Sequence, residues 1–242
     1  MARIYLPASH IKGNLVSITG EKARYLRSVT RCSEGDILIV FDGEGNCFRT
    51  KVANVGSREV LAEIERQFPC DVESPVHFTL GQGLLKGEKM DLVVQKTTEL
   101  GVNEIRPVIT DRSQLRETRK ISRWRKIVQE AARQSGRSVV PVVHEAVNLT
   151  DFLNSLPEGI LQGIVFYEEG GLKVSDAFSS FGTKTSSLVM LVGPEGGFTR
   201  GEIAAAEGKG FLIATLGKRI LRAETAAIAA AALVQFQFGG LE

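Results

Sequence analysis

The first 70 residues follow the two-residue hydrophobic period of short β-strands. Asp42-Gly43 supplies a turn signal after the most apolar run, and only residues 21–31 have a helical pattern. Pro69 and Pro75 mark the segment that follows as a linker. A small β barrel or sandwich is therefore expected over residues 1–70. Its predicted strands cover residues 37–41, 47–55 and 59–64.

From residue 71 onward, apolar strands alternate with amphipathic helices, a pattern typical of a largely parallel sheet. Glycines follow two of the predicted helices, Gly101 and Gly136, and indicate where these helices end. An α/β domain is therefore predicted over residues 71–242. Its strands are expected at 76–80, 104–110, 160–167, 188–192 and 211–216, and its helices at 89–100, 121–135, from 200 onward, and at 224–237.

Composition narrows the class of protein. Hydrophobic residues make up 43% and charged residues 24% of the 242 residues, which suits a globular protein with a sizeable core. No signal peptide and no membrane-length apolar run are found, so we expect no membrane partner. The three cysteines, Cys32, Cys47 and Cys70, have no metal-ligand spacing. We therefore expect no metal site, no disulfide framework and a reducing cytoplasmic location.

The charge is unevenly distributed. The net charge is only +2, yet residues 106–137 contain eight arginines and two lysines against three acidic residues. Such a local basic surface is the expected footprint of phosphate binding, although a solvated helix face would also fit. Arg24, Arg27 and Arg31 are predicted to share one face of the helix at 21–31 and add basic residues to the β domain.

Two loops near the C-terminus carry candidate chemistry. Residues 193–199 follow an apolar strand and contain three glycines, which allow a close backbone approach to a ligand. Thr199 and Glu202 have capping-box spacing, so this loop is expected to lead into a helix. Residues 216–225 also follow an apolar strand and precede an alanine-rich helix. Loops after neighbouring parallel strands share one crevice, which is a common small-molecule site, although plain tight turns are the alternative.

These loops resemble those of the bacterial 16S ribosomal RNA (uracil-N3)-methyltransferases of the SPOUT superfamily. The likeness extends over nearly the whole chain. Tyr25 and Thr30 depart from the pattern, which has His and Leu there. The matching motifs include Lys86-Gly87-Glu88-Lys89-Met90-Asp91, Arg112-Ser113, Gly193-Pro194-Glu195-Gly196-Gly197, and Leu216-Gly217-x-Arg219-Ile220-Leu221-Arg222-x-Glu224-Thr225-Ala226.

The resemblance implies a SPOUT trefoil-knot methyltransferase domain over residues 71–242 and a PUA-like RNA-binding β-barrel domain over residues 1–70. It also implies a homodimer that uses S-adenosyl-L-methionine to methylate N3 of a uridine in 16S rRNA of the 30S subunit. The residues implied to bind the cofactor are Tyr167, Glu168, Leu191, Val192, Gly193, Pro194, Glu195, Gly196, Gly197, Leu216, Gly217, Ile220 and Leu221.

Methyl transfer to a uracil N3 needs a deprotonated nitrogen aligned with the methyl donor. None of the three histidines falls near either loop, so we expect them to be structural. Arg222 is a candidate to stabilise the uracil anion or to hold a phosphate, and Glu224 is a candidate catalytic carboxylate or a helix-start residue. The residues predicted to contact RNA are Arg3, Arg27, Arg31, Lys86, Lys89, Arg112, Arg133 and Arg137.

Two other functions stay open at this point. Residues 81–86 follow a predicted strand and partly match the G-x-G-x-x-G pattern of dinucleotide enzymes, but a lysine replaces the third glycine. A noncatalytic rRNA-binding protein for ribosome assembly would also fit the basic segment, although it would not need the two glycine-bearing loops.

Overall fold

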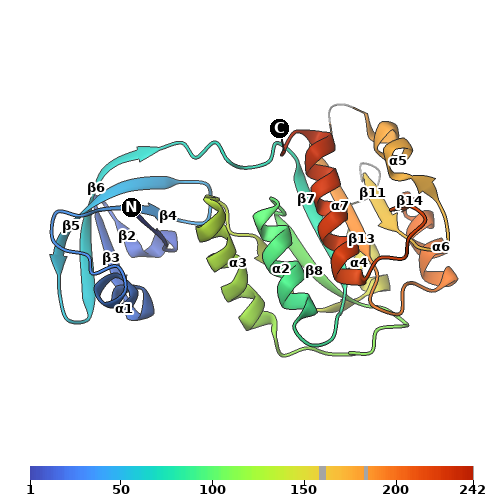
Figure 1. Cartoon of the computed structure of the whole chain (residues 1–242), viewed down its shortest axis with the longest axis horizontal. Helices are drawn as coiled ribbons and strands as arrows, with labels where there is room; N and C mark the ends of the chain where they lie inside the picture. The colour runs from blue at the N-terminus through green and yellow to red at the C-terminus, as the bar shows by residue number, and fades with distance from the viewer. Residues whose placement is uncertain (158–161, 183–184, 242) are drawn as a thin grey trace. The chain divides into compact units, whose positions relative to one another are not determined.

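The computed structural model describes residues 1–157, 162–182 and 185–241 of the chain (Figure 1). Two compact units are present. The first comprises Met1–Glu73 together with Ala132–Val140, and the second comprises Ser74–Ala131 together with Pro141–Glu242. No helix in the described part of the chain has the length and apolar character needed to cross a bilayer.

The first unit is a six-stranded sheet with the strand order β1-β4-β5-β6-β3-β2. β1 runs parallel to β4, and the other neighbours are antiparallel. The core consists of buried aliphatic side chains from the sheet and from the short helix α1, such as Ile18, Val40 and Leu26. The elements are β1 (Ala2–Tyr5), η1 (Ala8–His10), β2 (Ile11–Lys12), β3 (Leu15–Thr19), α1 (Gly20–Ser28), β4 (Ile37–Phe41), β5 (Cys47–Val55) and β6 (Glu59–Phe68).

The strands predicted at 37–41 and 47–55 are confirmed, and β6 continues past residue 64 to Phe68. The prediction for the helix is wrong at its C-terminal end. α1 stops at Ser28, and Arg31 has a φ of 52°, which is incompatible with a continuing helix. Arg31 therefore does not share a helix face with Arg24 and Arg27.

Cys47 and Cys70 form a disulfide, which corrects the expectation of free cysteines. The cause is the antiparallel register of β5 and β6, which places Cys47 opposite Phe68 and brings Cys70 within reach. A separation of 23 residues does not reveal this register. Cys32 is free and buried. The argument from cysteine usage to a reducing compartment thus loses its support.

A buried ion pair fixes residues 137–139 to the end of the Met1–Glu73 segment. The Arg137 guanidinium donates to Glu73 Oε2 at 2.7 and 3.0 Å, and the backbone amides of Ser138 and Val139 donate to Glu73 Oε1 at 2.9 and 3.0 Å. Arg3 Nη2 in turn donates to the Arg137 carbonyl at 2.8 Å. A buried charge requires partners of this kind, so the pair specifies how the 132–140 segment folds in this unit.

The second unit contains a parallel sheet with the order β10-β8-β7-β13-β11-β14-β12, and β9 pairs with β8. This confirms the predicted α/β pattern. Its elements are β7 (His77–Gly83), α2 (Lys89–Glu99), β8 (Glu104–Ile109), α3 (Ile121–Ser135), β9 (Val142–Val143), β10 (Val147–Asn148), α4 (Leu149–Asn154), β11 (Gly163–Phe166), β12 (Leu172–Lys173), α5 (Val174–Phe181), β13 (Ser187–Val192), α6 (Arg200–Gly208), β14 (Phe211–Thr215) and α7 (Ala223–Phe238).

Helices cover both faces of this sheet. Val189 and Leu191 of β13 pack with Phe152 of α4 and Ala206 of α6. α2 and α7 lie side by side and contact each other over the opposite face (Figure 1). Residues 160 and 161 of the predicted strand 160–167 lie outside the described residues, and the strand itself is Gly163–Phe166. The sequence pattern missed the short helices α4 and α5.

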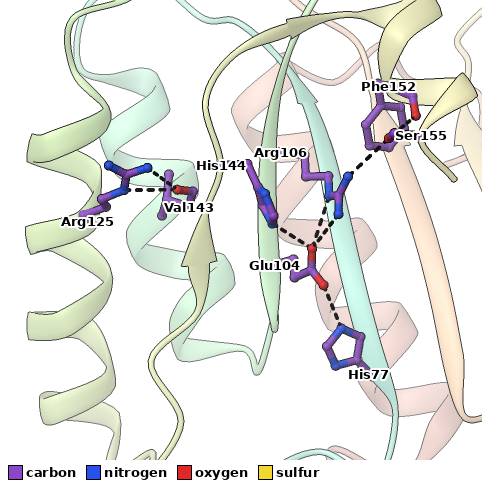
Figure 2. Close-up of polar contacts among 8 residues, drawn as sticks. All are labelled: His77, Glu104, Arg106, Arg125, Val143, His144, Phe152 and Ser155. Atoms are coloured by element: carbon purple, nitrogen blue, oxygen red, sulfur yellow. Dashed lines mark hydrogen bonds and ion pairs between the residues drawn. The ribbon is translucent and has the colours of Figure 1, made fainter. Parts of the chain in front are cut away.

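A polar network occupies the edge of this sheet where β7 and β8 begin (Figure 2). Glu104 Oε2 accepts from His144 Nε2 at 2.8 Å and from Arg106 Nη2 at 3.0 Å, and Glu104 Oε1 contacts His77 Nε2 at 3.3 Å. Arg106 also donates to Ser155 Oγ. Burial by itself raises the pKa of Glu104, but the hydrogen bonds and charge of Arg106, with the hydrogen bonds from the two histidines, outweigh burial and lower it.

Because this pKa is lowered on folding, Glu104 stabilises the fold above its unfolded-state pKa of about 4.3, and the contribution disappears as pH falls through the lower folded value. Glu104→Gln is expected to cost about 1–2 kcal/mol at pH 7, and urea unfolding between about pH 5 and 3 should show a smaller acid-induced loss than in the wild type. The control is Glu207→Gln, which removes an exposed carboxylate of α6. An equal acid response with and without the Glu104 carboxylate would contradict the prediction.

Candidate ligand site

A cavity of about 590 Å³ lies at the carboxyl edge of the parallel sheet. Its walls are the residues that follow β11, β13 and β14, together with the first turn of α7 and Lys89 of α2. Ligands of open α/β sheets bind at this edge because the loops after neighbouring strands converge there. The lining residues are Lys89, Phe166, Tyr167, Glu168, Val192, Gly193, Pro194, Glu195, Gly197, Thr215, Leu216, Gly217, Lys218, Arg219, Ile220, Leu221, Arg222, Ala223, Glu224 and Ala226.

The loop over residues 193–199 requires its glycines. Gly197 has a φ of 67°, and a Cβ there would clash with the Glu168 carboxylate. The loop ends in the predicted capping box, which is confirmed: Glu202 N donates to Thr199 Oγ1 at 3.3 Å, and Thr199 N donates to Glu202 Oε2 at 2.8 Å. These bonds satisfy amides at the start of α6 and set the direction in which the loop leaves the cavity.

The 193–199 loop packs against the end of β7. A Cβ on Gly83 would clash with the backbone nitrogen of Pro194, so only glycine allows the two backbones to approach this closely. The fully buried Gln82 donates its Nε2 to the carbonyls of Gly83, Val192 and Gly193 at 3.0, 3.4 and 3.2 Å. Gly81 and Gly83 therefore serve strand and loop packing within β7, which argues against the dinucleotide-binding alternative.

The second loop combines apolar and charged groups. Ile220 is 84% exposed, and Leu221 lies beside it along the cavity. Arg222 occupies the N-cap position of α7 without a side-chain capping hydrogen bond and is exposed, whereas Glu224 in the first turn is buried. Glu224 Oε2 has no hydrogen-bond partner among the described residues. Buried polar atoms usually have partners, so such an atom in a cavity-lining residue indicates that a ligand completes the site.

Glu195 is fixed at the rim of the cavity. Its Oε1 accepts from Lys89 Nζ at 3.0 Å and from the backbone amide of Lys86 at 3.2 Å. Burial tends to raise the pKa of Glu195, but the hydrogen bonds and charge of Lys89, with backbone hydrogen bonds, outweigh it and lower the pKa. Lys89 is therefore committed to the loop, while Lys218, Arg219 and Arg222 stay exposed at the opening.

Most of the predicted cofactor residues line this cavity, with two exceptions. Leu191 is 1% exposed and packs in the core beneath the site. Gly196 faces away from the cavity lining toward Arg112, whose Cβ would lie 2.9 Å from a Cβ at residue 196. The predicted catalytic residues Arg222 and Glu224 both line the cavity.

The residues predicted to contact RNA are divided between the two units. In the second unit, Lys86 is exposed, Lys89 binds Glu195, and the exposed Arg112 donates to the loop carbonyls of Gly196 and Phe198. None of these three positions excludes an approach of RNA, but two of the three side chains already hold the 193–199 loop.

In the first unit, Arg27 and Arg31 are accessible, and the Arg133 guanidinium stacks over the Tyr25 ring at 5.6 Å. One prediction needs correction here: Arg137 is 3% exposed and paired with Glu73, so its guanidinium is not available to a phosphate. Arg3 is half-buried, lies over the Phe41 ring at 4.6 Å and donates to the Arg137 carbonyl. Its contact with RNA stays a prediction.

Sequence reasoning missed Gln82 and several lining residues. In the sequence Gln82 is only part of an imperfect glycine motif, and its place just after an apolar strand indicates a buried polar side chain without showing which carbonyls it contacts. Thr215 and Phe166 end strands next to the predicted loops, so strand ends would have indicated them. The other lining residues outside the prediction are Lys218, Arg219, Ala223 and Ala226.

Two parts of the chain each match a model of a known protein family. Residues 72–235 match an RNA methyltransferase domain, and residues 18–65 match an RNA methyltransferase PUA domain. Two curated relatives are named ribosomal RNA small subunit methyltransferase E. The Synechocystis relative is 31% identical over 96% of this chain and 76% of its own length, and the Bacillus subtilis relative is 32% identical over 91% and 90%.

Solved structures agree with these matches. The ribosomal RNA small subunit methyltransferase E of Neisseria gonorrhoeae bound to S-adenosyl methionine has a TM-score of 0.91 and 35% identity and covers 100% of both chains. A putative methyltransferase of Legionella pneumophila in complex with the same cofactor has a TM-score of 0.86 and 32% identity over 97% and 96% of the two chains. The predicted arrangement of a PUA-like domain before an α/β domain is thereby confirmed.

Replacing Gln82 tests whether its side-chain amide holds the 193–199 loop against the end of β7. Gln82→Met keeps the side-chain length but removes the amide donor from three carbonyls, so we expect a loss of about 1–3 kcal/mol in the free energy of unfolding, measured with urea. The matched control is Gln95→Met on the exposed face of α2, for which a change within about 0.5 kcal/mol is expected. Equal stability of the two variants would show that the Gln82 amide does not hold the loop.

Proposed function

The chain belongs to the RNA methyltransferase family, and on this premise we propose that it methylates N3 of a specific uridine in 16S rRNA with S-adenosyl-L-methionine. The observation that carries the proposal is the cavity between the 193–197 and 216–222 loops, with the unpartnered carboxylate oxygen of Glu224 in its lining. The relatives' names supply the rRNA of the small subunit as the substrate class.

The cavity suits an adenosyl cofactor. Leu216, Ile220 and Leu221 offer apolar surface, and backbone groups of the 193–197 loop offer hydrogen-bonding positions that glycines leave uncovered. Tyr167 adds an aromatic ring with a polar hydroxyl to the lining. When bound, the cofactor supplies a sulfonium methyl group for transfer to a nitrogen.

The side chains at the start of α7 suit the remaining chemistry. Arg222 would stabilise the uracil ring once N3 has lost its proton, because a guanidinium is a cationic hydrogen-bond donor. Glu224 is the proposed acceptor of this proton, because one of its carboxylate oxygens has no other hydrogen-bond partner among the described residues. The base must leave its stack to reach a cavity at the edge of a sheet.

The matches to a PUA domain and to an RNA methyltransferase domain suggest separate roles for the two domains. We assign RNA docking to a domain over residues 1–70, with Arg27 and Arg31, and methyl transfer to a domain over residues 71–242. In the second unit, the proposed RNA contacts are Lys86, Arg112 and the exposed Lys218, Arg219 and Arg222 at the cavity opening. The trefoil knot of the 71–242 domain stays a prediction. The cytoplasm and the 30S subunit are the proposed setting, because that is where small-subunit rRNA is assembled.

A homodimer is proposed on the face that α2 and α7 form. Phe236 of α7 is 73% exposed and Leu92 of α2 is 41% exposed, although these helices cover the sheet together. Small alanine side chains along α7 would allow a second helix to approach closely. Large exposed apolar side chains on adjoining helices are typical of protein–protein contacts.

The function is tested by calorimetric titration with S-adenosyl-L-methionine and by transfer of labelled methyl groups to 16S rRNA and 30S subunits that lack the modification. Arg222→Ala should retain cofactor binding and lower kcat by about 100-fold or more, while Glu224→Gln should lower kcat and alter its pH profile. The control is Arg200→Ala at the start of α6, a side chain that is 91% exposed. RNA binding without cofactor binding would instead identify a noncatalytic assembly protein.

The dimer is tested by sedimentation equilibrium of the wild type and of Phe236→Asp. The charge should break an apolar interface and yield a folded monomer, whose unfolding midpoint no longer depends on protein concentration. Val72→Asp is the control, because Val72 is an exposed apolar residue outside both helices. A monomeric wild type at micromolar concentration would contradict the proposal.

A further inference from the structure

The loop that lines the cavity is also held from its outer side, by the segment that follows β8. Arg112 Nη1 donates to the carbonyls of Gly196 and Phe198, both at 3.2 Å. The Asp111 amide donates to Glu202 Oε1 at 2.8 Å, so the same segment also binds the capping box at the start of α6. These contacts join residues more than 80 positions apart in the sequence.

Arg112 packs closely against this loop at Gly196. A Cβ on Gly196 would lie 2.9 Å from Arg112 Cβ and 3.1 Å from the Arg112 carbonyl oxygen. Glu195 and Gly197, on either side of Gly196, both line the cavity. A shift of Arg112 would therefore displace the cavity wall one residue away, because the backbone between them is continuous.

Arg112 also has donors that the loop does not use. Its side chain is exposed, and its Nε and Nη2 have no hydrogen-bond partner among the described residues. Arg116 stabilises the segment by donating to the carbonyls of Thr110 and Asp111 at 2.9 and 2.8 Å. A guanidinium carries five donors in a planar fork, so one edge can hold carbonyls while another binds a phosphate.

We propose that Arg112 is a positioning residue that couples RNA binding to the cofactor loop: one edge of its guanidinium fixes the carbonyls of Gly196 and Phe198, and the other binds an RNA phosphate. The inference rests on the proposed function. A phosphate on the outer edge orders the side chain, which orders the loop and tightens cofactor binding. Coupling between two binding sites is reciprocal, so the cofactor must tighten RNA binding by the same factor.

The test measures the dissociation constant of S-adenosylhomocysteine by calorimetry, with and without saturating 16S rRNA, because this demethylated product of the cofactor has no methyl group to transfer. In the wild type, RNA should tighten binding at least about fivefold. Arg112→Ala should weaken binding about tenfold without RNA and abolish the RNA effect. Arg112→Lys keeps the charge but not the fork, so RNA affinity should largely recover while binding of S-adenosylhomocysteine stays weakened.

Arg119→Ala is the matched control, because it removes an exposed cation from the same basic segment. It should weaken RNA binding while leaving both the affinity for S-adenosylhomocysteine and the coupling factor unchanged. Coupling that persists in Arg112→Ala, or an unchanged affinity for S-adenosylhomocysteine in that variant, would overturn the inference. A wild type that binds neither S-adenosylhomocysteine nor S-adenosyl-L-methionine would instead overturn the proposed function.

Discussion

The close approach of the 193–199 loop to the end of β7 is the constraint on which the site depends. Any side chain at residue 83 would collide with Pro194, and the loop could not rest on the sheet. Gln82 then binds carbonyls from both strand ends, so the start of the loop is tied to the sheet. Arg112 contacts the other side of the loop. A wall held in this way is partly preorganised for a ligand, and the side that Arg112 holds is the part that RNA binding would order further.

Patterns within short stretches of sequence predict much of this architecture. The spacing of hydrophobic residues predicts β4, β5, β13 and α3, because side-chain direction repeats every two residues in a strand and every 3.6 residues in a helix. The capping box of α6 was predictable for the same reason, since Thr199 and Glu202 are three residues apart. The cavity followed from topology: loops after parallel strands meet at one edge, and the two candidate loops were both assigned to that edge.

Contacts between distant parts of the chain were not predictable. The disulfide depends on the register of β5 against β6, which no spacing of Cys47 and Cys70 encodes. Leu191 was assigned to the ligand, but alternation along β13 turns it into the core. Gln82 was overlooked because its three acceptors lie on a strand end more than 100 residues away or on the next residue of its own strand. A single sequence shows which residues can make such contacts, not which of them meet.

The net charge of the basic segment, residues 106–137, does not show how much positive charge is available to bind RNA. Arg137 is buried against Glu73, Arg112 divides its donors between two loop carbonyls and solvent, and Arg106 serves the Glu104 network. Desolvating a guanidinium is costly without a carboxylate or carbonyl partner, and the buried Arg137 has its partner in Glu73. The +7 excess of residues 106–137 thus overstates the positive charge offered to RNA. What an RNA phosphate encounters is set by the donors that remain exposed, and Arg112 stands out because it contributes to the fold and to that surface at once.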